Sequence, residues 1–285
     1  MKKKRNSSYV LKAMFSRPLV VAAAVIVVFF LVMAIFAPLI SPYDPYQTEI
    51  TGALKQPSAQ HILGTDKLGR DIATRLMYGA RTSLLIGFVS VMMSAVAGVL
   101  IGLVCGFYGG IINAVLSRVV DALMSVPNIM LAMALSLLFS NGTIIGLMIV
   151  LGLATVPTYA RIMAAEVMRI RDSDYMTVEK VLGMSSARKI FAHLLPNCIS
   201  PILVVLTANI GTTILCESSL NFLGLGVAAP TASWGGMVNE AYMMMMMCPA
   251  YALAPGICIM LLVLGFNILG DGLRDAIDPR LRGTL

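Results

Sequence analysis

Six long apolar runs, separated by polar stretches, set the pattern of this sequence. They lie at Leu19–Ile40, Ser83–Phe107, Val119–Phe139, Thr143–Ile162, Ile199–Phe222 and Ala252–Leu269. Each run is long enough to cross a hydrocarbon core of about 30 Å as an α-helix that rises about 1.5 Å per residue. Backbone in lipid must satisfy its own hydrogen bonds, which favours helices. We therefore predict an all-α integral membrane protein with six transmembrane helices.

The composition agrees with a membrane protein. Hydrophobic residues make up 58% of the 285-residue chain and charged residues only 12%, about half the share that is usual in a soluble domain. The five cysteines form no CxxC pair and have no histidine at ligand spacing. Neither a disulfide framework nor a metal site is predicted from them.

The basic residues predict which side of the membrane each segment occupies. Sixteen of the 21 Lys and Arg residues fall at the N-terminus, at Arg118, from Arg161 at the end of the fourth span to Lys189 before the fifth, and in the C-terminal tail. The other five lie on the opposite side: Lys55, Lys67, Arg70, Arg75 and Arg81. The positive-inside rule places the larger group, and both termini, in the cytoplasm. The net charge of +7 is then a topology signal, and nucleic acid is not an expected partner.

This topology divides the chain into five parts. The first apolar run exceeds the roughly 7–15 residues of a signal-peptide core, so we predict an uncleaved helix. The predicted parts are a cytoplasmic N-terminus (1–17), a first transmembrane helix (18–40), an extracytoplasmic loop with a short amphipathic helix (41–80), a five-helix permease domain (81–271) that includes cytoplasmic segment 166–197, and a cytoplasmic tail (272–285).

The polar segment Asp172–Asn197 predicts two short helices joined at Gly183. Asp174 and Ser185 are suited to cap them, and a glycine at the junction suits a left-handed residue. Pro196 is expected to prevent simple continuation of the second helix. Apolar residues fall on one face of each helix: Tyr175, Val178, Val181 and Leu182, then Ile190, Phe191, Leu194 and Leu195. Such a pair could insert into a groove on another protein or lie flat at the lipid interface.

The same segment resembles the EAA loop of ABC importer permeases, which docks into the ATPase subunit. Gly183, Leu195 and Pro196 fit the motif, whereas its leading Glu-Ala-Ala falls on Thr177, Val178 and Glu179. Residues 173–197 are therefore expected to couple this chain to an ATPase. The coupling residues that the resemblance implies are Tyr175, Thr177, Val178, Glu179, Leu182, Gly183, Ser185, Ser186, Leu195 and Pro196.

Two further stretches resemble the peptide/nickel branch of these permeases. They are "HILGTDKLGRDIATRLMYGARTSL" (61–84) and "ESSLNFLGLGVAAPTASWGGMV" (217–238). The resemblance implies a second, homologous permease subunit, two ABC ATPases that bind ATP and Mg, and an extracytoplasmic solute-binding protein. It also implies the cytoplasmic membrane of a bacterium or archaeon. Peptides, nickel, metallophore complexes and opines all suit such a permease.

Residues 61–84 also predict local structure. A short helix could start at Thr65 or Asp66, with Asp71 and Arg75 paired one turn apart. It would contact a delivered substrate or brace the fold. In the second span, three glycines at four-residue spacing (Gly98, Gly102, Gly106) predict close helix packing, within one subunit or in a dimer interface.

Charged residues inside the spans usually face an interior. Asp121 lies one turn after Arg118, which predicts a structural ion pair. Glu217, with Asn221 one turn later, is the candidate for the translocation path, and local hydrogen bonding is the alternative. The run Met243–Met247 suggests a soft-metal site, but we interpret it as apolar filler near the sixth span.

Catalytic motifs are missing from the sequence. It has no G-x-x-x-x-G-K-[ST], HExxH or GxSxG pattern, so the chain is expected to be non-catalytic and to bind no cofactor of its own. A secondary carrier or channel is the alternative function, although few charged or discontinuous helices meet near mid-membrane. A membrane-embedded enzyme is a third class, disfavoured by the missing motifs.

Overall fold

The computed structural model describes residues 14–173, 176 and 182–277, and every regular element in these ranges is helical. The prediction of an all-α fold is confirmed. Five helical stretches are long and apolar enough to cross a membrane. They are α2 (Pro18–Ile40), α3 (Ile72–Tyr108), α6 (Ile144–Arg171), α9 (Leu195–Phe222, with the helical turns from Ser186 that precede it) and α11 (Pro249–Ile277).

The predicted third span is not one straight helix. It comprises α4 (Gly110–Met124) and α5 (Asn128–Phe139), which are bent by 94° at the break between them. Pro127 explains the break, because proline donates no hydrogen bond and disfavours helical backbone at the residue before it. Counting this pair as one broken span gives up to six crossings.

The predicted separate helix before the second span is wrong. Residues 65–71 form a turn closed by a bridge between Thr65 and Asp71, and α3 begins only at Ile72. The Asp71 side chain caps it by accepting a hydrogen bond of 2.7 Å from the Thr74 amide. At 37 residues, α3 is about 55 Å long, so it projects beyond a bilayer core of about 30 Å.

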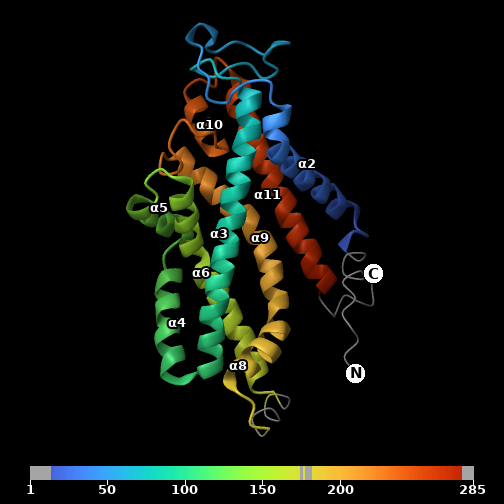
Figure 1. Cartoon of the computed structure of the whole chain (residues 1–285), viewed down its shortest axis with the longest axis vertical. Coiled ribbons are helices and arrows are strands. Elements are labelled where there is room, and N and C mark those ends of the chain that lie inside the picture. The colour runs from blue at the N-terminus through green and yellow to red at the C-terminus, as the bar shows by residue number, and fades with distance from the viewer. Residues whose placement is uncertain (1–13, 174–175, 177–181, 278–285) are drawn as a thin grey trace.

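The centre of the bundle is the contact between α3 and α6, and α9 packs against both (Figure 1). Gly98, Gly102 and Gly106 face α6, where an added Cβ would come within 2.5–2.6 Å of α6 atoms. The three glycines therefore serve packing within the subunit. Helix α11 lies along α9, and α2 lies against α3 and α11.

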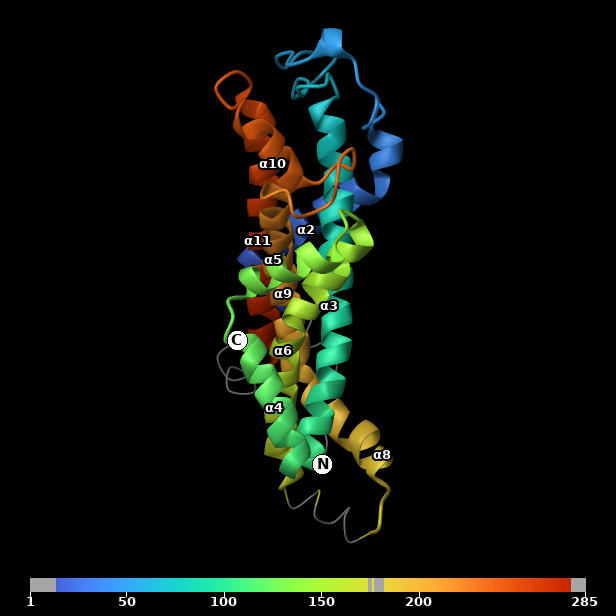
Figure 2. The same cartoon turned by 90° about the vertical axis from the view of Figure 1, so that its left-hand side faces the viewer.

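The two ends of the elongated molecule differ in structure (Figures 1 and 2). One end, here the loop end, carries residues 41–71, with the short helix η1 (Ile50–Gly52), and α10 (Trp234–Tyr242). The opposite end, the segment end, carries residues 182–194. Arg17 and Asp275 form an ion pair, so the start of α2 and the end of α11 lie side by side.

Candidate functional site

The candidate coupling segment leaves α6 at Arg171 and returns to the bundle at α9. Arg171 fixes its start by donating from Nη1 to the Gly106 carbonyl at 3.0 Å, which joins the ends of α6 and α3. Gly183 has φ +69°, the left-handed conformation predicted for the junction. The predicted coupling residues Tyr175, Thr177, Val178 and Glu179 lie outside the described residues.

The second half of the segment continues directly into a span. Ser185 occupies the predicted N-cap position of α8 (Ser186–Arg188), although its side chain makes no capping hydrogen bond. A π-helical stretch, η2 (Lys189–Leu194), then leads into α9. Pro196 does not end the helix, because it lies in the first turn of α9, but the π-helical stretch before it agrees with the prediction that the second helix does not continue simply. A proline disturbs the preceding turn of a helix, and a π turn is a known local adjustment.

The apolar side chains of the described part of the segment are split between burial and exposure. Ile190 and Leu194 are buried in the core, whereas Leu182 is 68% exposed and Phe191 57% exposed. Figure 2 shows the α8 region beside the end of α9 and projecting from the bundle. The segment thus has one set of side chains that ties it to the spans and another set available to a partner.

Glu217 and Asn221, the translocation-path candidates, are both buried and hydrogen-bonded within the subunit. The Asn221 amide donates to the Glu217 carboxylate and to the Glu217 carbonyl, and the Ser218 hydroxyl donates to the carboxylate at 3.2 Å. Asn221 Oδ1 accepts from the Val227 amide at 2.7 Å. These bonds hold the loop after α9 in place. A role in the translocation path stays a prediction.

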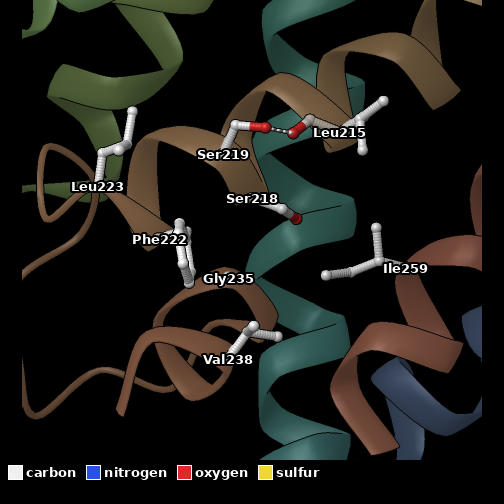
Figure 3. Close-up of a pocket in the computed structure, with 8 residues that line it drawn as sticks. All are labelled: Leu215, Ser218, Ser219, Phe222, Leu223, Gly235, Val238 and Ile259. Atoms are coloured by element: carbon white, nitrogen blue, oxygen red, sulfur yellow. Dashed lines mark hydrogen bonds between the residues drawn. The ribbon is translucent and has the colours of Figure 1, made fainter. Parts of the chain in front are cut away.

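An open apolar cleft of about 290 Å³ lies beside this network, between α9, α10 and α11 (Figure 3). Its lining is mainly aliphatic and aromatic. The Ser219 hydroxyl bonds to the Leu215 carbonyl at 2.8 Å, so it is already satisfied by its own helix. The lining residues are Leu215, Ser218, Ser219, Phe222, Leu223, Gly235, Val238 and Ile259.

The predicted ion pair of Asp121 with Arg118 is wrong. Asp121 accepts a hydrogen bond of 2.9 Å from Arg161 of α6 instead. Arg118 forms no ion pair with any residue that the structure describes. One turn of α4 separates Arg118 from Asp121, but α6 packs against α4 and brings Arg161 close from a distant part of the sequence.

A buried charge cluster at the loop end was missed by the sequence analysis. Arg70 bonds to Asp66 at 2.5 Å and to Glu240 at 2.8 Å. Arg75 lies 3.5 Å from Asp66 and 3.9 Å from Glu240. The Tyr251 hydroxyl donates to Glu240 at 2.8 Å. Because Arg75 pairs here, the predicted Asp71–Arg75 pair does not form, and Asp71 instead contacts His61 at 3.0 Å.

Only three of the five residues of this cluster lie in one sequence motif. The stretch 61–84 holds Asp66, Arg70 and Arg75, but Glu240 and Tyr251 come from the other end of the chain. The cluster joins the loop before α3 to α10 and α11. It therefore braces the fold, one of the two roles predicted for that stretch.

The methionine run does not form the predicted filler. Met243–Met247 form a turn at the loop end between α10 and α11, and Met246 is 97% exposed. The turn is held by its backbone, since Gln56 donates to the Met247 carbonyl at 2.8 Å. Across the described residues, no three His, Cys, Asp or Glu side chains gather as a metal site would require.

Comparison with known proteins covers nearly the whole chain. Residues 98–283 match the profile of a family described as binding-protein-dependent transport system inner membrane component. Residues 7–57 match that of the N-terminal transmembrane domain of oligopeptide transport permease C. The described fold also resembles a chain of the methionine ABC transporter MetNI, solved in an inward-facing conformation, with a TM-score of 0.57 at 17% identity over 72% of this chain and 97% of that chain.

Three relatives illustrate the similarity in sequence. The dipeptide transport system permease protein DppC of Alkalihalophilus pseudofirmus is 39% identical over 95% of this chain and 89% of its own length. The oligopeptide transport system permease protein OppC of Bacillus subtilis is 38% identical over 94% and 87%. The glutathione transport system permease protein GsiD of Shigella boydii is 39% identical over 92% and 86%.

Proposed function

The chain belongs to the family of binding-protein-dependent transport system inner membrane components, and we propose that it forms half of the translocation pathway of an ATP-driven peptide importer. It is a multi-pass membrane permease of the ABC importer class. The substrate class is inferred from relatives of nearly full length whose names specify dipeptide, oligopeptide and glutathione transport. Its transport complex would contain a second permease, two ATPases that bind ATP and Mg, and a solute-binding protein.

The observation that carries the coupling role is the exposed apolar surface of the segment end. Leu182 and Phe191 are exposed, whereas the neighbouring Ile190 and Leu194 are packed into the core. Movement of a partner bound to the exposed side chains would therefore be transmitted to α9, because η2 continues into that helix. Closure of an ATPase pair would then bias the spans between two arrangements.

We also propose that the segment end faces the cytoplasm and the loop end faces outward. The paired ends of α2 and α11 support termini on one side, and the positive-inside rule assigns that side to the cytoplasm. The loop end would receive the solute-binding protein. A secondary carrier would need no ATPase, so uptake that survives ATP depletion would favour that alternative.

The variant Phe191→Ala tests the coupling role. An aromatic anchor at the centre of an interface is worth about 2 kcal/mol or more, which corresponds to a loss of affinity of roughly thirtyfold. We expect the variant to bind the ATPase subunits more weakly in detergent, measured by biolayer interferometry. Phe36→Ala on α2, which removes an exposed aromatic side chain far from the segment, should leave the affinity unchanged. Equal affinities for both variants would contradict the proposal.

A further inference from the structure

The break between α4 and α5 leaves irregular backbone within a candidate span. Ser125, Val126, Pro127 and Asn128 are all exposed in the isolated chain. Non-helical backbone at membrane depth is tolerated only where it is buried in protein or lines a water-filled cavity. The break also packs near the middle of α6, beside Thr155 and Thr158, so it lies well away from that helix's ends. A surface of this kind is unsuited to lipid.

A groove of about 240 Å³ opens at this break and is lined by both apolar and neutral polar side chains. Thr155 and Thr158 come from α6, and Asn209 and Thr212 come from α9. The Thr155 and Thr212 hydroxyls donate to carbonyls of their own helices, at 2.9 Å and 3.1 Å. Their oxygens therefore keep the capacity to accept hydrogen bonds from a solute or water. The groove lining itself carries no charged residue.

The Asp121–Arg161 ion pair lies at one end of this groove. Arg161 Nη1 is 2.9 Å from Asp121 and 3.7 Å from the sulfur of Met124, a groove-lining residue. Arg161 follows Thr158 by one turn of α6, in the direction of the segment end. The Asp121 and Arg161 side chains are 44% and 58% exposed, and charges are costly to leave against lipid. Water or a second subunit must face them.

We propose that this groove is the subunit's wall of the solute path and that the Asp121–Arg161 pair closes its inner end. The inference rests on the proposed permease function and adds the site within it. Neutral hydroxyls and amides offer hydrogen bonds to peptide groups without selecting a side chain. The pair bridges α4 and α6, so a shift of either helix would open it and connect the groove to the cytoplasm.

Thiol labelling of Thr212→Cys tests the path. The assembled transporter, with Cys216→Ala in this chain to remove its partly exposed native cysteine, is reconstituted in liposomes and treated with a charged, membrane-impermeant maleimide. We expect Thr212→Cys to be labelled at least tenfold faster than Val28→Cys, an exposed apolar position in the middle of α2. Thr158→Cys provides a second site if Thr212→Cys fails to assemble.

Charge variants test the closure of the inner end. With reagent supplied from the cytoplasmic side, Asp121→Asn should speed the labelling of Thr212→Cys severalfold. The double reversal Asp121→Arg with Arg161→Asp should return the rate toward that of the parent protein. If the labelling rate of Thr212→Cys is the same in all of these variants, the Asp121–Arg161 pair does not close the inner end of the groove.

Equal labelling at Thr212→Cys, Thr158→Cys and Val28→Cys would overturn the path assignment, because the groove would then be covered by protein or lipid. ATPase stimulation by the solute-binding protein, measured on the same preparations, distinguishes failure of the groove assignment from failure of the proposed permease function. If the ATPase is stimulated but the groove cysteines are not labelled faster than Val28→Cys, the proposed permease function is retained and the groove is not the solute path. Loss of both ATPase binding and stimulation in the parent protein would count against the permease function itself.

Discussion

Gly102 shows at the scale of one residue how closely α3 and α6 approach. A Cβ at this position would lie 2.5 Å from the Ala160 carbonyl oxygen and 2.6 Å from the Met163 Cβ. Both atoms belong to α6, and a backbone oxygen cannot move without moving its helix. The four-residue spacing of Gly98, Gly102 and Gly106 predicted close packing. Which helix the glycines face was left open until the structure paired α3 with α6.

The variant Gly102→Ala should therefore destabilise the protein. Overpacking of a close contact costs about 1–3 kcal/mol, which should lower the midpoint of thermal aggregation in detergent. Gly256→Ala on α11 is the matched control, because an added Cβ there meets nothing within 4 Å. That control should match the parent protein. Equal midpoints for the two variants would contradict the packing described here.

Glu217 illustrates a residue whose type alone leaves its role open. A carboxylate inside a span suggests a functional group, yet the structure gives it hydrogen bonds from Asn221 and Ser218. We expect Glu217→Gln to retain uptake, since its amide oxygen can accept from Asn221 and its amide nitrogen can donate to the Ser218 hydroxyl oxygen. Glu217→Ala removes the acceptor and should cost about 1–3 kcal/mol of stability.

Peptide uptake and thermal stability, measured together for the two Glu217 variants, separate the roles. Loss of uptake in Glu217→Gln, with unchanged stability, would place the carboxylate on the translocation path. If only Glu217→Ala loses stability and Glu217→Gln keeps normal uptake, the Glu217 carboxylate has a structural role.

Elements differ in how far the sequence predicts them. The apolar lengths of α2, α3, α6, α9 and α11 are enough to identify them as helices, because lipid leaves few alternatives for the backbone. Their ends are less predictable: α3 begins eleven residues before the apolar run at Ser83, since the Asp71 cap and buried charges permit polar residues in its first turns. Pro127 is the sequence signal for the break in the third span, but the prediction from apolar length alone passed over it and gave one continuous helix.

The charge cluster is the feature that joins elements at the loop end. Arg75→Met should be strongly destabilising, by about 3–5 kcal/mol, because removing one partner leaves buried charges without compensation. Arg75 also donates to the carbonyls of Pro45 and Pro230, at 3.2 Å and 3.4 Å, so loop contacts are lost as well. We expect a lower melting midpoint in detergent and faster proteolysis of residues 41–71.

Lys67→Met is the control for that variant, since Lys67 is an exposed cation in the same loop. Its midpoint should stay within error of the parent protein. A similar small shift for both variants would mean that the cluster contributes little to holding the loop.

At the scale of the whole molecule, the two ends are linked by continuous helices. Helix α9 runs from the coupling segment to the Glu217 network, and α3 runs from its contact with Arg171 to the charge cluster. The resemblance predicted the coupling role of residues 173–197, whereas the motifs at 61–84 and 217–238 indicated the branch of permeases and left the role of residues 61–84 open. The groove at the α4–α5 break was beyond sequence reasoning, because its walls come from separate helices that only packing brings together.

The proposed docking of the segment end into an ATPase can be tested by cross-linking. Ser186→Cys is exposed at the start of α8. In membranes that contain the full transporter, it should form a disulfide or short-linker cross-link with a cysteine placed in the ATPase groove. The yield should change between nucleotide-free and ATP-bound conditions. Met246→Cys, also at an exposed position but at the loop end, should give none. Absence of any cross-link at Ser186→Cys, in a complex that still binds its ATPases, would contradict docking through this segment.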